Sequence, residues 1–284
     1  MNETIQVAAL HDGSELAVTV LGSGPAVLLP ARIEPYDDAT AETMRQWGAE
    51  PDLGSTLATA LARNFTVVAA DYEGHRMAHP APDTLTPAHL AADLLAIASA
   101  ANAERFAYYG YSWLGLAGLQ LALRTDRLWA LALGGFPPLD GPYAAMLAVT
   151  RAAHRAAIEQ PSPATDLAEI EPGDWESAGI SASGDQTMQF MTLYEALQSF
   201  DDASALPQLA LPRLAFAGRE DTIVYGPRWG DTTVEIAPPL AANRDRLIDA
   251  GWQVELLPGL DHTGAMRSEH VLPVLQPWLL AHRP

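Results

Sequence analysis

Three polar residues of this sequence have the types and the order that nucleophilic catalysis requires. Ser112, Asp221 and His262 each follow an apolar stretch, within the segments 110–115 (GYSWLG), 218–221 (GRED) and 259–262 (GLDH). A serine hydroxyl is a weak nucleophile at its ordinary pKa, so it needs a base to remove its proton and a carboxylate to orient that base. The three residues are therefore candidates for a nucleophile, a base and an orienting acid.

The segment around Ser112 must hold its hydroxyl in a fixed direction. Residues 106–123 contain no charge, and these 18 residues are the shortest length for a membrane-spanning helix. Three glycines and two polar residues interrupt the stretch, which favours a buried strand, a tight turn at Ser112 and a helix. Such a turn projects serine from the carboxyl edge of a sheet, where the first N–H groups of the helix can bind an oxyanion.

Strand-like and helix-like patterns alternate along most of the chain. Asp12-Gly13 is typical of a hairpin turn, and Thr86-Pro87 of a helix start. Short apolar runs predict strands at 15–20, 26–29, 65–70, 128–133, 214–217 and 254–257, and helical spacing predicts helices at 52–62, 87–97 and 113–123. The alternation predicts an α/β fold with a mostly parallel central sheet, an N-terminal hairpin and helices on both faces. Because parallel strands end at one edge, the three candidate residues can converge there.

The alternation stops between residues 137 and 207. Helical patterns occur at 143–158 and 187–200, with no convincing strand between them. We therefore predict a core made of 1–136 and 208–284, interrupted by a helical insertion at 137–207.

Composition excludes several kinds of chemistry and partner. The chain of 284 residues has 16 basic and 35 acidic residues, hence a net charge of −19, with no cysteine and no lysine. Thiol nucleophiles, Schiff bases and phosphate-loop lysines are excluded, and the charge disfavours nucleic acid and anionic membranes. We expect one elaborated domain, a small-molecule substrate, no cofactor and a cytoplasmic location, because the start has no apolar signal region. A homodimer is left open.

Taken together, the segments resemble the α/β-hydrolase fold family over nearly the whole chain. Residues 22–29 (GSGPAVLL) and 71–75 (DYEGH) are similar to segments that precede the family's nucleophile turn, and the acid and histidine loops follow in family order. The resemblance implies a capped, cofactor-free serine hydrolase of esterase or lipase type. Ser112 would be the nucleophile, His262 the base and Asp221 the acid, with the backbone N–H groups of Trp113 and Arg32 as the oxyanion hole.

Other residues compete for some of these roles. Glu220 and Asp261 adjoin the candidate acid and base, and Asp140 follows another strand, so the choice of Asp221 is one of four. His75 and His79 have a spacing found in metal sites, but Pro80 follows them and the helical acid of such motifs is missing. We expect no metal.

Three features depart from the family pattern. Pro30-Ala31 replaces the usual His-Gly before the oxyanion donor, and Leu114 stands where the nucleophile turn usually has glycine. Residues 32–46 form a longer loop than usual, which we expect at the rim of the pocket. The Arg32 side chain is expected to pair with Glu34 or Asp37 rather than with a substrate carboxylate.

Apolar residues of the insertion, of the nucleophile turn and of the segment before Arg32 are candidates for the pocket walls: Ala31, Leu114, Tyr143, Met146, Met191 and Tyr194. With the chain's acidity, they favour a small, largely apolar ester cleaved through an acyl-enzyme. Two alternatives remain: a non-hydrolytic cyclase, acyl transferase or lyase in a small-molecule pathway, and a ligand-binding protein without catalysis.

Overall fold

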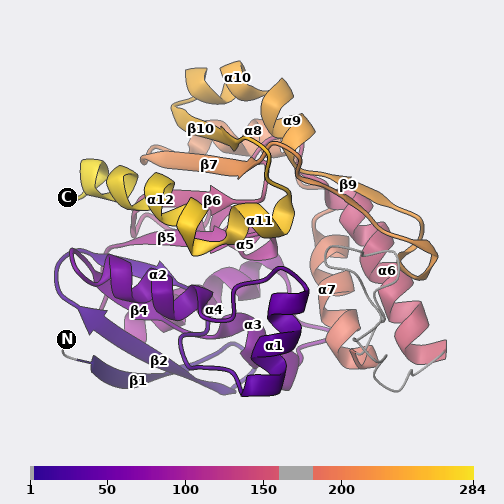
Figure 1. Cartoon of the computed structure of the whole chain (residues 1–284), viewed down its shortest axis with the longest axis horizontal. Coiled ribbons are helices and arrows are strands. Elements are labelled where there is room, and N and C mark those ends of the chain that lie inside the picture. The colour runs from indigo at the N-terminus through magenta and orange to yellow at the C-terminus, as the bar shows by residue number, and fades with distance from the viewer. Residues whose placement is uncertain (1–2, 160–181) are drawn as a thin grey trace.

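A sheet of eight strands forms the centre of the molecule (Figure 1). A computed structural model describes residues 3–159 and 182–284. In spatial order the strands are β1 (Glu3–Ala9), β2 (Glu15–Gly22), β4 (Thr66–Ala69), β3 (Ala26–Leu29), β5 (Phe106–Tyr111), β6 (Leu128–Gly134), β7 (Arg213–Gly218) and β10 (Trp252–Leu257). The strand β2 is antiparallel to both of its neighbours, and all later pairs are parallel. The predicted mostly parallel sheet with an N-terminal hairpin is confirmed.

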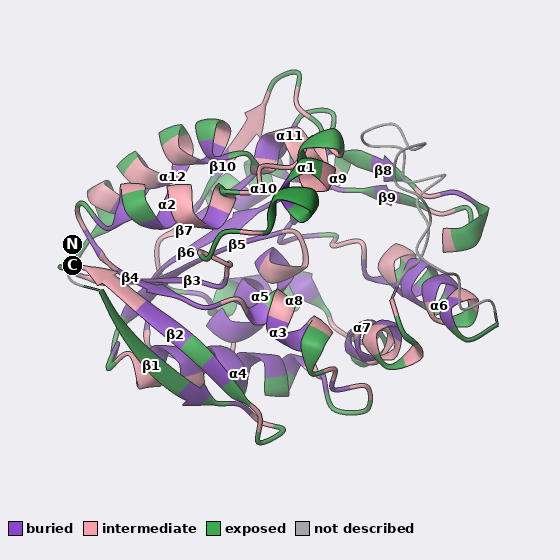
Figure 2. Cartoon of the chain, turned by 60° about the horizontal axis from the view of Figure 1, so that its bottom comes forward, coloured by how far each residue is buried: buried purple, intermediate pink, exposed green. Residues whose placement is uncertain are grey.

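Helices cover both faces of this sheet (Figure 2). On one face lie α2 (Leu53–Leu61), α11 (His262–Met266) and α12 (Ser268–His282); on the other lie α3 (Tyr72–Ala78), α4 (Pro87–Ala100) and α5 (Trp113–Ala122). The alternation within β3 explains the two layers, because Val27 and Leu29 pack into one apolar core and Leu28 into the other. Buried on both faces, the central strands read as continuous apolar runs.

Helix starts in the structure follow local capping chemistry. The side chain of Thr86 accepts a hydrogen bond from His89 N at 3.3 Å, and Pro87 occupies the first turn of α4. A start of this type also occurs in the segment that we predicted as a long loop. There the Asp37 side chain accepts from Thr40 N at 3.0 Å and begins α1 (Asp38–Gln46), so only part of 32–46 is irregular.

Between β6 and β7 the described chain is helical. It forms α6 (Tyr143–Glu159), α7 (Gly184–Ala196) and α8 (Asp202–Ala205), and α6 and α7 lie side by side to one side of the sheet (Figure 1). The residues 160–181 of the predicted insertion lie outside the described residues. Three side chains of α7 donate hydrogen bonds to the segment after β4 and hold the helix against the core: Gln186 Nε2 to Met77 O at 2.6 Å, Gln189 Nε2 to Arg76 O at 3.0 Å, and Thr192 Oγ1 to Pro82 O at 2.5 Å.

Two short strands and two short helices complete the region beside the insertion. The strands β8 (Thr222–Val224) and β9 (Thr233–Glu235) form an antiparallel pair, and the helices α9 (Ala237–Ala242) and α10 (Arg244–Asp249) lead from it towards β10. Within 3–159 and 182–284, no helix is both long and apolar enough to cross a membrane.

The hairpin between β1 and β2 carries a partly buried ion pair. Arg76 is fully buried, and its Nη2 lies 2.9 Å from Asp12 Oδ2. Burial alone would raise the pKa of Asp12, but hydrogen bonds from Ser14 and the charge of Arg76 lower it to about 2. A carboxyl whose pKa is lowered by folding stabilises the folded state above its ordinary pKa of 3.8, and this stabilisation is lost as the pH falls through about 2.

We predict that Asp12→Asn lowers the free energy of unfolding at pH 7 by about 2 kcal/mol. This is less than the ~3–5 kcal/mol for breaking a fully buried pair, because Asp12 is partly solvated. Urea unfolding of the wild type and the variant between pH 7 and pH 2 measures the difference, which should shrink in the acid range. The exposed Asp126→Asn is the control and should change stability by less than ~0.5 kcal/mol; an equal loss in both variants would contradict the ion-pair account.

Candidate active site

The structure brings together the three residues that the sequence singles out. Ser112 Oγ lies 3.0 Å from His262 Nε2, and His262 Nδ1 lies 3.0 and 2.9 Å from the two carboxylate oxygens of Asp221. The three side chains come from the turns that follow β5, β7 and β10. Their hydrogen-bonded order allows a proton to move from the serine oxygen to the imidazole while the carboxylate holds the ring.

The turn at Ser112 has the strained shape that the sequence predicts. Ser112 has a φ of 57°, in the left-handed region, and its N–H donates to Gly134 O at 2.8 Å. Gly110 is needed because a Cβ there would collide with the carbonyl oxygen of Leu114. The helix α5 begins directly after the serine, so its N-terminus lies beside the hydroxyl.

Of the four acids considered, Asp221 is the one that contacts His262. Its side chain is completely buried, whereas Glu220 is exposed. The other two have different partners: Asp261 Oδ1 accepts from Gly264 N at 2.7 Å and caps α11, and Asp140 Oδ2 accepts from Asn243 Nδ2 at 2.7 Å. The buried position shields the Asp221 carboxylate from water and leaves the imidazole as its partner.

A buried tyrosine anchors the backbone of His262. The hydroxyl of Tyr111 donates to His262 O at 2.8 Å, and the two rings lie 5.2 Å apart. Burial raises the pKa of Tyr111 well above its ordinary value, and the charge of Asp221 adds to this effect, so the hydroxyl stays a neutral donor. Gly135 leaves room for this arrangement, since a Cβ there would lie 2.5 Å from the tyrosine ring and 3.0 Å from the imidazole.

The two backbone amides that the sequence suggested as oxyanion donors have no partner in the described protein. Within the described part of the chain, the N–H groups of Trp113 and Arg32 donate no hydrogen bond to protein. Both residues line a cavity together with Ser112 and His262. Their role as oxyanion donors stays a prediction. The backbone of Arg32 lies close to the start of α2, where a Cβ on Gly54 would collide with its carbonyl oxygen.

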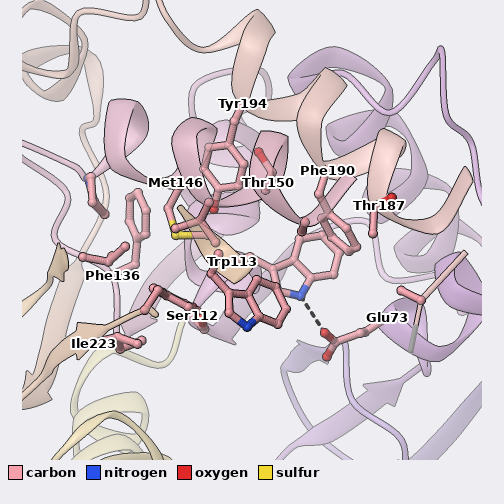
Figure 3. A pocket seen from close by; sticks show the side chains of 18 of the residues that line it. Glu73, Ser112, Trp113, Phe136, Met146, Thr150, Thr187, Phe190, Tyr194 and Ile223 are labelled. Atoms are coloured by element: carbon pink, nitrogen blue, oxygen red, sulfur yellow. Dashed lines mark hydrogen bonds between the residues drawn. The ribbon is translucent and has the colours of Figure 1, made fainter. Parts of the chain in front are cut away.

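Two cavities meet at Ser112. One, of about 520 Å³, lies beneath α6 and α7 and has mainly apolar walls, and the other, of about 590 Å³, lies beside α1 and α2. Glu73, Ser112, Trp113 and Trp229 line both cavities. Figure 3 shows the first cavity, whose walls include Phe136, Met146, Thr150, Phe190, Tyr194 and Ile223. We call it the α6–α7 cavity, and the other the α1–α2 cavity.

Four of the six predicted pocket residues line these cavities. Met146 and Tyr194 lie in the walls of the α6–α7 cavity, and Ala31 and Leu114 in those of the α1–α2 cavity. The side chain that replaces the usual glycine of the nucleophile turn therefore contributes to a cavity wall.

The other two pocket candidates, Tyr143 and Met191, lie outside the described cavity walls. The Tyr143 ring packs edge-on against Phe136 and Phe200, with centroids 6.0 and 5.6 Å away, and Met191 packs against the core. Helical spacing identifies the apolar face of a helix but does not separate packing residues from those that reach a cavity.

The predicted partners of the Arg32 side chain are wrong. Its Nη1 lies 3.4 Å from Asp71 Oδ2, an acid far away in the sequence, and among the described residues it forms no ion pair with Glu34 or Asp37. Its other nitrogens donate to the backbone carbonyls of Glu34 and Pro35, at 3.1 and 3.2 Å. The backbone turn after β3 brings the guanidinium to the end of β4, where Asp71 begins α3.

Sequence reasoning gave no role to Glu73. Its side chain is exposed to the cavities, and Oε1 accepts a hydrogen bond from Trp113 Nε1 at 2.9 Å (Figure 3). Desolvation by the surrounding cavity walls raises the pKa of Glu73; the Trp113 hydrogen bond acts in the opposite direction, and the charge of Asp71 adds to the rise. A signal was present, because Glu73 follows the carboxyl end of a predicted parallel strand, where the other site residues gather.

The described residues contain no group of three or more His, Cys, Asp or Glu side chains arranged to hold a metal ion. The histidine pair considered above packs ring against ring, with centroids 4.8 Å apart, and His75 Nε2 is hydrogen-bonded to Ser14 Oγ at 2.8 Å.

Known proteins similar to this chain are remote in sequence. No family model matches it. A protein of Yersinia enterocolitica named "Putative carbamate hydrolase RutD" is 27% identical over 188 residues, which cover 60% of this chain and 66% of that protein, slightly less than two thirds of its length.

Two solved structures are similar over nearly the full length. The enol-lactonase of Burkholderia xenovorans LB400 has a TM-score of 0.62 and 21% identity, covering 96% of this chain and 99% of that one. A thermophilic esterase of Thermogutta terrifontis has a TM-score of 0.61 and 18% identity, covering 100% of both chains. At these identities the likeness is evidence for a shared fold.

Proposed function

We propose that this chain, which has the α/β-hydrolase fold, is a serine hydrolase that cleaves a carboxylic ester or a related acyl bond. The observation that carries the proposal is the unbroken hydrogen-bonded chain from Asp221 through His262 to Ser112, at the junction of two cavities. The relatives add support, because their names describe an esterase, an enol-lactonase and a carbamate hydrolase.

In the proposed reaction, His262 Nε2 takes the proton of Ser112 as Oγ attacks the acyl carbonyl. The carboxylate of Asp221 stabilises the imidazolium that forms. The N–H groups of Trp113 and Arg32, at the start of α5 and after β3, hold the oxyanion of the tetrahedral intermediate. His262 then gives its proton to the leaving alcohol, and the acyl group remains on Ser112. Water, deprotonated by the same imidazole, releases the acid and restores the serine.

The insertion fits the role of a cap over the site. The helices α6 and α7 supply Met146, Thr150 and Tyr194 to the cavity wall, and the segment after β4 ties α7 to the core. The largely apolar walls favour an apolar substrate portion there, since each buried methylene contributes about 0.8 kcal/mol. We therefore propose a small ester with one apolar portion beneath α6 and α7.

Labelling with a fluorophosphonate tests the proposal, because this reagent reacts with activated serine nucleophiles. We expect one adduct per chain, located on the peptide that contains Ser112, and hydrolysis of short-chain aryl esters by the unlabelled protein. Absence of labelling, under conditions in which a control serine hydrolase reacts fully, would contradict the proposal. An acyl product transferred to a second substrate rather than to water would favour the acyl transferase alternative.

A further inference from the structure

The carboxylate of Glu73 is placed to contact a substrate bound at Ser112. It lines both cavities that meet at the serine, and its side chain is exposed to them. One oxygen, Oε1, accepts the hydrogen bond of the Trp113 indole at 2.9 Å. The other oxygen, Oε2, accepts no hydrogen bond from the described residues, so it is an acceptor open to a ligand.

No cation of the described protein neutralises this carboxylate. Glu73 is the one charged side chain among the described residues that line the α6–α7 cavity. In the α1–α2 cavity, the guanidinium of Arg32 is 3.4 Å from Asp71, and the remaining acid, Glu50, accepts from Ser268 N and Oγ at 2.7 Å. The neutral indole N–H is the partner that the protein provides to Glu73.

A carboxylate that lies beside largely apolar walls without a cationic partner carries a desolvation penalty that no opposite charge offsets. Desolvation accordingly raises the pKa of Glu73. A positively charged ligand group would remove this penalty and keep the group ionised, whereas a ligand carboxylate would be repelled by both Glu73 and Asp71. The net charge of −19 further attracts cations to the molecule.

We propose that Glu73 recognises an ammonium group, so that the substrates are esters whose acyl or alcohol portion carries a positive charge. This inference rests on the proposed hydrolase function. The ammonium group lies against Glu73 Oε2 while the ester carbonyl lies at Ser112 Oγ, and the apolar remainder of the substrate contacts the cavity walls. Glu73 is thus a specificity residue, distinct from the three residues that exchange protons.

Two pairs of esters test the proposal, each pair differing in charge but not in shape. The first pair is trimethylammonioethyl butyrate and neohexyl butyrate, in which a quaternary carbon replaces the nitrogen of the alcohol portion. In the second pair the acyl portion carries the trimethylammonium group in one ester and the corresponding quaternary-carbon group in the other. We expect wild-type kcat/KM to be higher for the charged member of at least one pair. Glu73→Gln keeps an acceptor for the Trp113 indole but removes the charge that attracts the quaternary ammonium group, and it should lower the charged-to-neutral ratio about 10- to 100-fold.

Glu104→Gln is the matched control. It removes the same charge from an exposed position before β5, at the strand end opposite Ser112, and should leave the ratio unchanged. Equal kcat/KM for both members of both pairs in the wild type would overturn the proposal without recourse to a variant, as would an equal fall for both members in Glu73→Gln. If Ser112→Ala hydrolysed the neutral ester at a rate close to that of the wild type, the proposed function itself would fail, and the two failures are thus distinguishable.

Discussion

Ser112→Ala is expected to lower kcat for ester hydrolysis by roughly 10⁴- to 10⁶-fold. The variant removes the hydroxyl that lies 3.0 Å from His262 Nε2, so no acyl-enzyme can form. Residual hydrolysis comes from water activated by the histidine and from the oxyanion donors, which do not depend on the serine side chain. Initial rates with the preferred aryl ester, and loss of fluorophosphonate labelling, measure the effect.

A second serine provides the control for this prediction. Ser14 Oγ also lies within hydrogen-bond distance of a histidine, at 2.8 Å from His75 Nε2, but it donates to Asp12 Oδ1 at 2.6 Å and follows a hairpin turn rather than preceding a helix. Ser14→Ala should retain wild-type kcat within about two-fold, since it belongs to neither cavity wall. Comparable losses in both variants, or wild-type activity in Ser112→Ala with unchanged thermal stability, would contradict serine catalysis.

The comparison of these two serines shows what makes the sequence informative. A serine beside a histidine is common chemistry, whereas an apolar run, a glycine, a serine and then a helical pattern form a specific architectural signal. The prediction of the sheet and of the turn at Ser112 depended on such patterns over four or more consecutive residues, and the structure has a strand at each predicted run. Once the strands are parallel, their ends must lie at one edge, which brings Asp221 and His262 to the same region.

The missed helices had weaker local signals. The first, α1, has a capping aspartate but few apolar residues, and only Ala41 is buried, so it lacks a clear apolar face. The last, α12, contains Pro273 and Pro277, which normally end a helix, yet it continues because its buried face packs against the sheet and α2. Whether these two helices form depends on tertiary packing, which cannot be predicted directly from a single sequence.

The polar contacts of the site were predicted less well than its position. The sequence indicated local acids as partners of Arg32, but the guanidinium contacts Asp71, 39 residues away. The hydrogen-bond partner of Glu73 is likewise Trp113, which lies on a different element. Contacts between side chains of separate loops depend on the exact path of each loop, and strand patterns do not determine this path.

Asp221→Asn is expected to lower kcat by roughly 10³- to 10⁴-fold while KM changes little. Both oxygens of Asp221 face His262 Nδ1, which therefore carries the proton and leaves Nε2 free to accept from Ser112. An asparagine can present its NH₂ group to Nδ1 instead. The proton then moves to Nε2, which no longer accepts the serine proton. Stopped-time assays of ester hydrolysis and the rate of fluorophosphonate labelling should fall by a similar factor, because both require an activated Ser112.

Two neighbouring acids test whether this effect is specific to the buried carboxylate. Glu220→Gln removes an exposed charge one residue earlier, and Asp261→Asn changes the cap of α11 next to the histidine. Asparagine is a good helix cap and can replace Asp261 at the start of α11. Because Glu220 is exposed and does not contact His262, both variants should retain kcat within about ten-fold. If Asp261→Asn reduced kcat as strongly as Asp221→Asn, orientation of the imidazole would depend on the start of α11 rather than on the buried carboxylate. A loss confined to Asp221→Asn identifies the charge that selects the tautomer, since the three variants remove one negative charge each within the same two loops.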